Sequence, residues 1–333
     1  MRVGIKNNRG AALVVTLAVV AVLIAAVLQL GRLVSRSVNM TALEKDRFSA
    51  RQKAVSGINL ATLLLTQDKE LSDQDSIQET WADAEKISGA LSMLGFEDGN
   101  LDLKIIDERS KICINAVLES FPGNTVNPDQ IQILENWVTQ VVAPADGDTG
   151  PDPAEIINSV KDWLDSRDDD AVSGLSGAES DYYLALDPPY AAANGPFNQV
   201  AEIWRVKGMD RDRFLAAMDM EDPVQLEDFL TVYGLDEAGE QDRGYRYDSR
   251  VNINTVNASV LSALLPEGYE EAAQDLVDYR AQKNETGTDF LNPLDKGWYK
   301  RVIQLSQEES ERFDSRIEYS SDLFRVVCTA RHG

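Results

Sequence analysis

"NNRGAALVVTLAVVAVLIAAVLQLGRL", residues 7–33, places a glycine between a short basic head and a long apolar run. From Ala11 to Leu28 the chain has no charged residue and a single hydroxyl, that of Thr16. As a helix this run measures about 27 Å, close to the thickness of the hydrocarbon core of a bilayer. A cleavable secretory signal has a shorter apolar core followed by a small-residue cut site, whereas this chain continues into Arg32 and Arg36. We therefore predict a retained membrane helix over residues 11–30.

The flanks of this run predict its orientation and the length of its helix. Arg2, Lys6 and Arg9 precede it without an acidic residue, which favours a cytoplasmic N-terminus and an exported remainder. No proline occurs before Pro122. Beyond the membrane, apolar residues recur at spacings close to multiples of 3.5, namely Val34, Val38, Phe48, Val55, Ile58 and Leu65. We expect one helix to run far into the exported part, and assign residues 11–98 to an N-terminal helical segment.

Composition excludes several classes of protein. Lys and Arg number 32 against 56 Asp and Glu, and a net charge of −24 repels phosphate backbones, so we expect no nucleic-acid partner. The single histidine, His332, is the penultimate residue, and no glycine-rich phosphate loop or nucleophile elbow occurs. Catalysis by carboxylates alone stays open. The two cysteines, Cys113 and Cys328, predict either one disulfide bridge or two buried free thiols.

The rest of the chain predicts an α+β fold. "NLDLKIIDE" (100–108) alternates as a strand does, and "SRIEYSSDLFRVVCTA" (315–330) alternates in the same way and could pair with it. Helical spacing lies between them at residues 129–142, 154–164, 199–207 and 212–218, with Gly208 as a stop. We therefore assign a sheet to residues 99–112 and 286–333, and an inserted all-helical domain to residues 113–285.

The insertion contains a short internal sequence repeat. "ICINAV" (112–117) and "VNINTV" (251–256) share one pattern, and each precedes a short helix, a proline turn and a second helix. The turns are Pro122-Gly123 and Pro266-Glu267-Gly268. We expect Asn115 and Asn254 to cap the helices that follow them. The units are helix-hairpin-helix-like, but the second hairpin carries acid where a phosphate would bind, so we interpret both as protein-packing modules.

A basic leader ending in glycine, a small residue after it and a long helix together resemble the type IV pilin and pseudopilin class. The resemblance implies that prepilin peptidase cuts after Gly10, so that the mature chain starts at Ala11 with a methylated amine. Most members have Glu at the fifth mature position, where this chain has Val15. The K-type minor pseudopilin of the type II secretion system characteristically lacks that Glu.

A longer stretch carries a closer resemblance to that K type. Residues 156–209 contain Asp-Trp-Leu-Asp, Gly-Ala-Glu, Tyr-Tyr, Pro-Pro-Tyr and Asn-Gly-Pro-Phe in the family's order. The resemblance implies a pilin-like helix on an antiparallel sheet, a single span in the inner membrane and a periplasmic C-terminal domain. It also implies I-type and J-type minor pseudopilins as partners and a place at the pseudopilus tip, from which the protein supports export of folded proteins. It is weakest at the C-terminus, where the family usually continues with another strand, so either the sheet is incomplete or the sequence is abridged. A minor pilin of a type IV pilus and a membrane-anchored carboxylate-dependent enzyme are the alternatives.

An acidic loop follows the helix predicted at residues 154–164. Alone, such a loop is typically a solvated charged surface, and its spacing is not that of an EF-hand. The K-type family binds calcium in the loops of its helical insertion, and calcium takes six to eight oxygen ligands. The resemblance therefore implies a calcium site formed by Asp165, Asp168, Asp170, Glu179 and Asp181. We expect Asp162 to be a surface or capping residue. Tyr182, Tyr183 and the Pro188-Pro189-Tyr190 turn are expected to pack against the loop.

Overall fold

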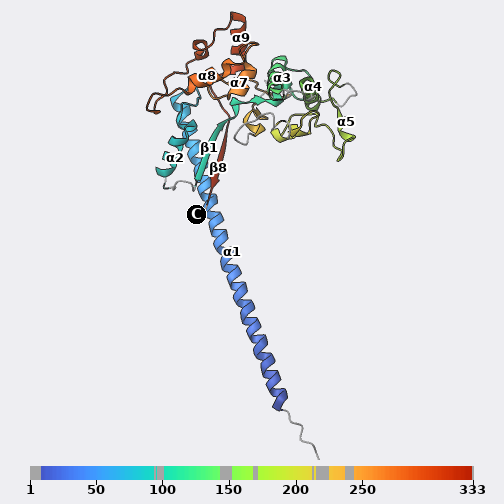
Figure 1. Ribbon diagram of the computed structural model, residues 1–333, viewed down its shortest axis with the longest axis vertical. Helices are drawn as coiled ribbons and strands as arrows, with labels where there is room; N and C mark the ends of the chain where they lie inside the picture. The colour runs from blue at the N-terminus through green and yellow to red at the C-terminus, as the bar shows by residue number, and fades with distance from the viewer. Residues whose placement is uncertain are drawn as a thin grey trace, which may run out of the picture. The chain divides into compact units, whose positions relative to one another are not determined.

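One long helix opens the protein. The computed structural model describes residues 9–93, 95, 101–142, 152–167, 172–211, 214, 225–236 and 244–331. Helix α1 spans Arg9–Leu71 without interruption (Figure 1), as the absence of proline predicts. Among the described residues it is the one helix long and apolar enough to cross a membrane, and this fits a single-pass anchor. Residues 11–30 of α1 are exposed, as a membrane-facing segment requires.

The helical segment predicted to reach residue 98 is wrong in its extent, because α1 ends at Leu71. The hydroxyl of Ser72 donates to the carbonyl of Gln74 (2.8 Å) and accepts from the amide of Gln74 (3.1 Å). Such local bonds from a serine side chain compete with helical backbone bonds. A turn of 3₁₀-helix (η1, Thr80–Ala82) and a separate helix (α2, Ala84–Met93) follow the break.

By its internal contacts the chain forms two compact units. The first takes Met1–Leu60, Ala90–Leu103 and Cys328–Gly333, and the second takes Ala61–Gly89 and Lys104–Val327. The second unit contains α3 (Pro128–Val142), α4 (Pro153–Leu164), α5 (Ser180–Leu184), α7 (Ala258–Leu264), α8 (Ala272–Ala281) and α9 (Gln307–Arg316). Its shorter 3₁₀ turns are η2 (Glu108–Ser110), η3 (Ile114–Val117), η4 (Val200–Arg205), η5 (Leu226–Asp228) and η6 (Trp298–Arg301).

The strands form small two-stranded sheets. β1 (Leu101–Asp107) pairs with β8 (Phe324–Ala330), which confirms the pairing predicted between the two alternating stretches (Figure 1). β2 (Ile112–Cys113) pairs in parallel with β3 (Leu230–Thr231), and β6 (Val251–Asn252) pairs in parallel with β7 (Ile317–Glu318). β4 (Leu235–Asp236) and β5 (Arg246–Tyr247) form an antiparallel pair.

The α+β class holds, but the insertion is not all-helical. It contains β3 to β6, and its predicted end at residue 285 is not a structural boundary. One hydrophobic core runs from Ile112 to Ile317, so that Trp298 and Phe313 share it with Ile253. The short strands form where the fold brings two backbone stretches side by side, as it does Ile112–Cys113 and Leu230–Thr231, and local periodicity does not register such pairing.

Two of the four helices predicted in the insertion are present as α-helices. Residues 129–142 and 154–164 correspond to α3 and α4, while residues 199–207 contain the 3₁₀ turn η4 rather than an α-helix. Gly208 has a φ of +86°, the left-handed conformation expected of a glycine that ends a helix. The helix predicted at residues 212–218 lies outside the described residues except for Phe214.

The two asparagines of the internal repeat do not cap helices. Asn115 is fully buried, donates to the carbonyls of Phe197 and Val232 (3.0 and 2.9 Å) and accepts from the Phe197 amide. Asn254 donates to the Tyr319 carbonyl and accepts from the Trp298 indole (2.8 Å). The prediction was wrong because both side chains are buried. A buried amide bonds to whichever backbone groups the core places beside it. Asn257 caps α7 instead.

Both cysteines are free thiols, and of the two only Cys113 is buried as the second predicted alternative requires. Cys113 lies in β2, where its thiol donates to the Tyr233 carbonyl at 3.2 Å. Burial raises its pKa to about 12, which keeps it protonated and unreactive. Cys328 lies in β8 and is half-buried.

Candidate metal centre

Three carboxylates converge at the C-terminal end of α4. The oxygens of Asp162, Asp165 and Glu179 all lie within 4.8 Å of one another. Two oxygens on opposite sides of a calcium ion are about 5 Å apart, so this spacing fits a shared ion. Asp162 and Glu179 are buried, and carboxylates so close together repel one another strongly unless a cation or proton lies between them. The donor set is the hard, all-oxygen chemistry that calcium prefers.

The predicted ligands are only partly brought together. Asp165 and Glu179 belong to the group, whereas Asp181 is exposed on α5 and is not part of it. Asp168 and Asp170 lie outside the described residues. The expectation for Asp162 is wrong, because its side chain is fully buried at the centre of the group. Its position three residues before Asp165 is the signal that could have found it, since residues three apart lie on one face of a helix.

The backbone of the returning loop approaches Asp162 very closely. The amide of Ser173 donates to both carboxylate oxygens of Asp162 (2.9 and 3.2 Å). A Cβ placed on Gly177 would lie 2.0 Å from one of these oxygens and 3.0 Å from the Ser173 nitrogen. Only glycine fits there, so the loop sequence "SGLSG" is shaped by contact with the carboxylate.

Polar contacts hold the same loop in place from outside. Asn158 on α4 donates to the hydroxyl of Ser176 at 3.2 Å. The ammonium of Lys207 donates to the Ser176 carbonyl at 3.0 Å and pairs with Glu155 at the same distance. Such bonds preorganise a loop for an ion whether or not the ion is present.

A cluster of aromatic side chains includes Trp163, the residue next to Asp162 on α4. Trp163 packs edge-on against Tyr183 (ring centroids 5.2 Å apart) and parallel to Phe197 (6.1 Å), and Tyr183 stacks on Tyr190 (5.4 Å). Tyr183 and Tyr190 thus pack on Trp163 of α4 and on each other, while their predicted packing against the acidic loop stays a prediction. Burial raises the pKa of Tyr183, whose hydroxyl accepts from the Lys207 amide. Tyr182 instead stays partly exposed, with the ammonium of Lys207 above its ring.

A second acidic group, which the sequence did not reveal, joins the end of α1 to the segment after it. Carboxylate oxygens of Asp68, Asp75 and Glu79 also lie within 4.8 Å of one another. Burial raises the pKa of Glu79 to about 7, and burial and the charge of Asp75 raise that of Asp68. The Trp81 indole donates to Glu79 at 2.9 Å, and the Ser321 amide donates to Asp75 at 2.6 Å. Burial therefore favours the neutral form of Glu79 below about pH 7.

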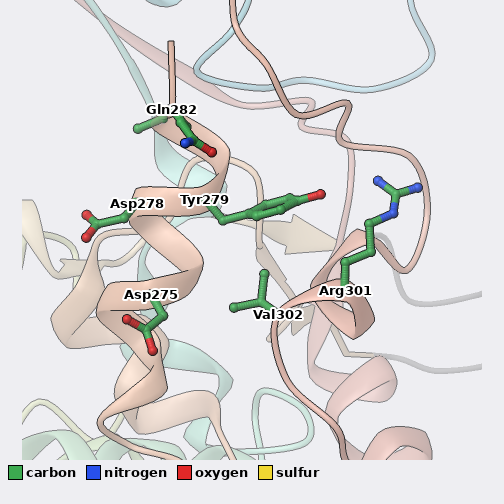
Figure 2. A pocket seen from close by; sticks show the side chains of 7 residues that line it. Asp275, Asp278, Tyr279, Gln282, Arg301 and Val302 are labelled. Carbon is green, nitrogen blue, oxygen red and sulfur yellow. The ribbon is translucent and has the colours of Figure 1, made fainter. Parts of the chain in front are cut away.

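An open hollow of about 610 Å³ lies between α8 and η6. Figure 2 shows the Tyr279 ring extending toward Arg301, while the Asp278 carboxylate points in the opposite direction, away from Arg301. The Arg301 guanidinium binds Asp295 (2.6 Å) and the Pro293 carbonyl (3.0 Å). Two carboxylates, Asp275 and Asp278, also line the hollow, three residues apart on α8.

The predicted processing site lies at the start of α1. Gly10 and Ala11 are both helical and exposed, immediately before the apolar run. A long N-terminal helix that is first apolar and then joined to strands and a large head defines the pilin and pseudopilin class of membrane-anchored subunits.

Comparison with known proteins narrows that class. A family model described as type II secretion system protein K matches residues 111–220. Relatives named type II secretion system protein K include one from Klebsiella pneumoniae, 25% identical over 61% of this chain and 59% of the relative. A relative from Pectobacterium carotovorum is 22% identical over 91% of this chain and 86% of the relative. A third, from Pseudomonas aeruginosa, is 24% identical over 87% of this chain and 78% of the relative. These matches are all to type II secretion system protein K, the family that the motifs of this chain resemble.

A solved structure has the same fold. It is a chain of the GspK-GspI-GspJ complex from the type 2 secretion system of enterotoxigenic Escherichia coli. The TM-score is 0.56 at 17% identity, over 86% of this chain and 88% of that chain. At this identity the likeness shows the fold, which agrees with the predicted pilin-like α+β class.

Proposed function

We propose that the protein caps the tip of the periplasmic pseudopilus of a type II secretion system and helps to initiate its assembly, so that folded proteins can be exported. The observation that carries this proposal is the size of the second unit, which takes Lys104–Val327 as well as Ala61–Gly89. Subunits of a thin filament repeat along its axis with little room between their heads. A head of this size fits where nothing is stacked above it.

Val15 supports the same position. A carboxylate within a bilayer is costly unless it is paired, and in most pilins the Glu at this place can neutralise the amine of a neighbouring subunit. A subunit at the tip has no subunit above it, and so no neighbouring amine for a carboxylate at this position to neutralise. Val15 then leaves nothing unpaired and avoids burying a charge.

The partners we propose are the I-type and J-type minor pseudopilins, since the matching structure is that of a GspK-GspI-GspJ complex. The test is to co-purify the three chains in detergent and then to label this protein on assembled pseudopili. We expect a complex of all three and labels at one end. Labels along the shaft, or no association with either partner in the presence of calcium, would contradict the tip position.

Two other functions remain as alternatives. A minor pilin of a type IV pilus would instead co-purify with pilus subunits and would be found on surface pili. A carboxylate-dependent periplasmic enzyme would have an activity that disappears when one Asp or Glu is replaced without loss of fold. We favour the assembly role because the relatives found by comparison are named type II secretion system protein K.

We expect the mature protein to begin at Ala11, in the inner membrane with its head in the periplasm. Prepilin peptidase would cut after Gly10, and the new amine would be methylated. Intact mass measurement on protein from the membrane fraction should give a chain that lacks residues 1–10. Full-length protein with Met1 in cells that contain active peptidase would show that the leader is retained.

We also propose that Asp162, Asp165 and Glu179 bind calcium, together with Asp168 and Asp170 from the loop. An ion that binds only the folded state adds about 2.7 kcal/mol to the free energy of unfolding at a hundredfold excess over Kd. Adding chelator should therefore lower the melting temperature, and millimolar calcium should restore it.

The variant for this test is Asp162→Asn, which keeps the shape and an acceptor for the Ser173 amide but removes the charge. We expect it to fold without calcium and to lose most of the calcium response. Asp181→Asn is the matched control, since Asp181 lies outside the group. Equal calcium responses in the wild type and Asp162→Asn would reject this ligand set.

A further inference from the structure

Two arginines follow the apolar run of α1. The helix carries no charged residue from Ala11 to Gly31, and then has Arg32 and Arg36. Both side chains are exposed, and neither guanidinium has a hydrogen bond or an ion pair with another residue that the structure describes. The first acidic residue of the whole chain is Glu44. The two positive charges are therefore unbalanced within the protein.

Helix geometry sets the depth of both arginines. At 1.5 Å per residue, a span over residues 11–30 covers a hydrocarbon core of about 30 Å. On the same rise, the Cα atom of Arg32 lies about 3 Å beyond the span and that of Arg36 about 9 Å beyond it. The headgroup layer on each side of the core is about 5–7 Å thick. Arg32 thus starts within this layer, and Arg36 reaches back into it because side chains on a helix lean toward the N-terminus.

The two arginines lie on one face of α1. Residues four apart on a helix are neighbours, with Cβ atoms about 5–6 Å from each other. Each guanidinium presents a planar fork of N–H donors that matches two oxygens of a phosphate. Two such forks, side by side at the level of the headgroups, can bind one phosphate between them.

The surroundings favour a lipid phosphate over other anions. Lipid phosphates lie at this depth, whereas a soluble polyanion would also meet the net charge of −24 that the chain carries. Glu44 lies about 12 Å along the helix axis beyond Arg36, further than the Debye length of about 8 Å at physiological ionic strength. The acidic remainder therefore does not cancel the attraction. In a zwitterionic headgroup an amine of the same molecule balances the phosphate, so an anionic headgroup gains most.

We propose that Arg32 and Arg36 bind the phosphate of an anionic phospholipid at the membrane surface and so fix the depth of α1 in the bilayer. The predicted orientation places both arginines on the exported side, where Lys and Arg are less common near the end of a span. Phosphate binding gives them a role at that place. The site depends neither on the tip position nor on calcium.

The test measures lipid binding to the full-length protein in detergent by native mass spectrometry, with phosphatidylglycerol and phosphatidylcholine as the two probes. We expect the wild type to bind phosphatidylglycerol more tightly. Arg32→Gln with Arg36→Gln should weaken this binding about tenfold or more, because both charge contacts to the phosphate are lost.

Arg47→Gln with Arg51→Gln is the matched control. These arginines are also exposed and four residues apart on α1, but they start about 25 Å beyond the span. Their replacement should change phosphatidylglycerol binding less than about twofold. Both double variants should melt as the wild type does, since all four positions are exposed.

Inorganic phosphate separates a lipid site from a site for free phosphate. At millimolar concentration it should not displace phosphatidylglycerol, because it has no acyl chains to hold it at this depth. The proposal is overturned if the wild type binds both lipids equally, if both double variants weaken binding equally, or if inorganic phosphate displaces the lipid. If Arg32→Gln with Arg36→Gln kept the lipid affinity but no longer co-purified with a partner pseudopilin, the arginines would bind an acidic protein segment, and the proposal would equally be overturned.

Discussion

Gly177→Ala is expected to lower the free energy of unfolding by about 3 kcal/mol and to remove the response to calcium. The new Cβ would lie 2.0 Å from an oxygen of Asp162, which is fully buried on α4 and bound by the Ser173 amide. Neither the helix nor the carboxylate can yield, so the loop must move. Overpacking costs about 1–3 kcal/mol, and loss of the bond to a charged acceptor adds to it.

The measurement is chemical denaturation of the full-length protein in detergent, with calcium and with chelator. Gly195→Ala is the matched control in the same insertion, because its nearest neighbour would be a carbonyl 3.8 Å away. It should change the free energy of unfolding by less than about 0.5 kcal/mol and keep the calcium response. If Gly177→Ala behaved like this control, the close approach of the loop to Asp162 would be wrong.

Sequence reasoning succeeded where hydrophobic periodicity carried the signal and failed where hydrogen bonds or partners distant in sequence decided the structure. The long helix followed from an uninterrupted apolar run, and α3 and α4 followed from their periodicity. The end of α1 was missed because Ser72 bonds to the backbone of Gln74, an interaction that hydrophobic spacing does not record. The two-residue strands were missed because each depends on a partner distant in sequence, as Ile112 does on Leu230.

The metal centre shows the same division. Asp165 and Glu179 could be predicted, because the motifs around them resemble a family with calcium in this loop. Asp162 was predicted to be a surface or capping residue, because its position beside Trp163 on the helix gave no sign of burial. What brings it inside is the chain that returns over it at Ser173 and Gly177, a contact that only the folded loop creates. Asp68, Asp75 and Glu79 likewise meet only because α1 stops at Leu71.

Gly57→Ala is the second substitution with a large expected effect, and it tests the packing of α1 on β8. A glycine inside a helix normally costs about 0.5–1 kcal/mol relative to alanine, so replacing it should stabilise the protein unless space is lacking. Here the new Cβ would lie 2.4 Å from the Cys328 sulfur and 3.4 Å from Leu101. We expect the clash to prevail, with a net loss of about 1–2 kcal/mol in the free energy of unfolding.

A double-mutant cycle identifies the cause. Cys328→Ala removes the sulfur, so Gly57→Ala in that background should become neutral or stabilising, and the two substitutions should couple by about 1 kcal/mol or more. Gly89→Ala in α2 is the reference, because nothing lies within 4 Å of its new Cβ, and it should stabilise the protein in either background. Additive effects of Gly57→Ala and Cys328→Ala would mean that the sulfur does not lie against the helix. Coupling would mean that glycine is required at position 57 because the sulfur of Cys328 lies against α1 there.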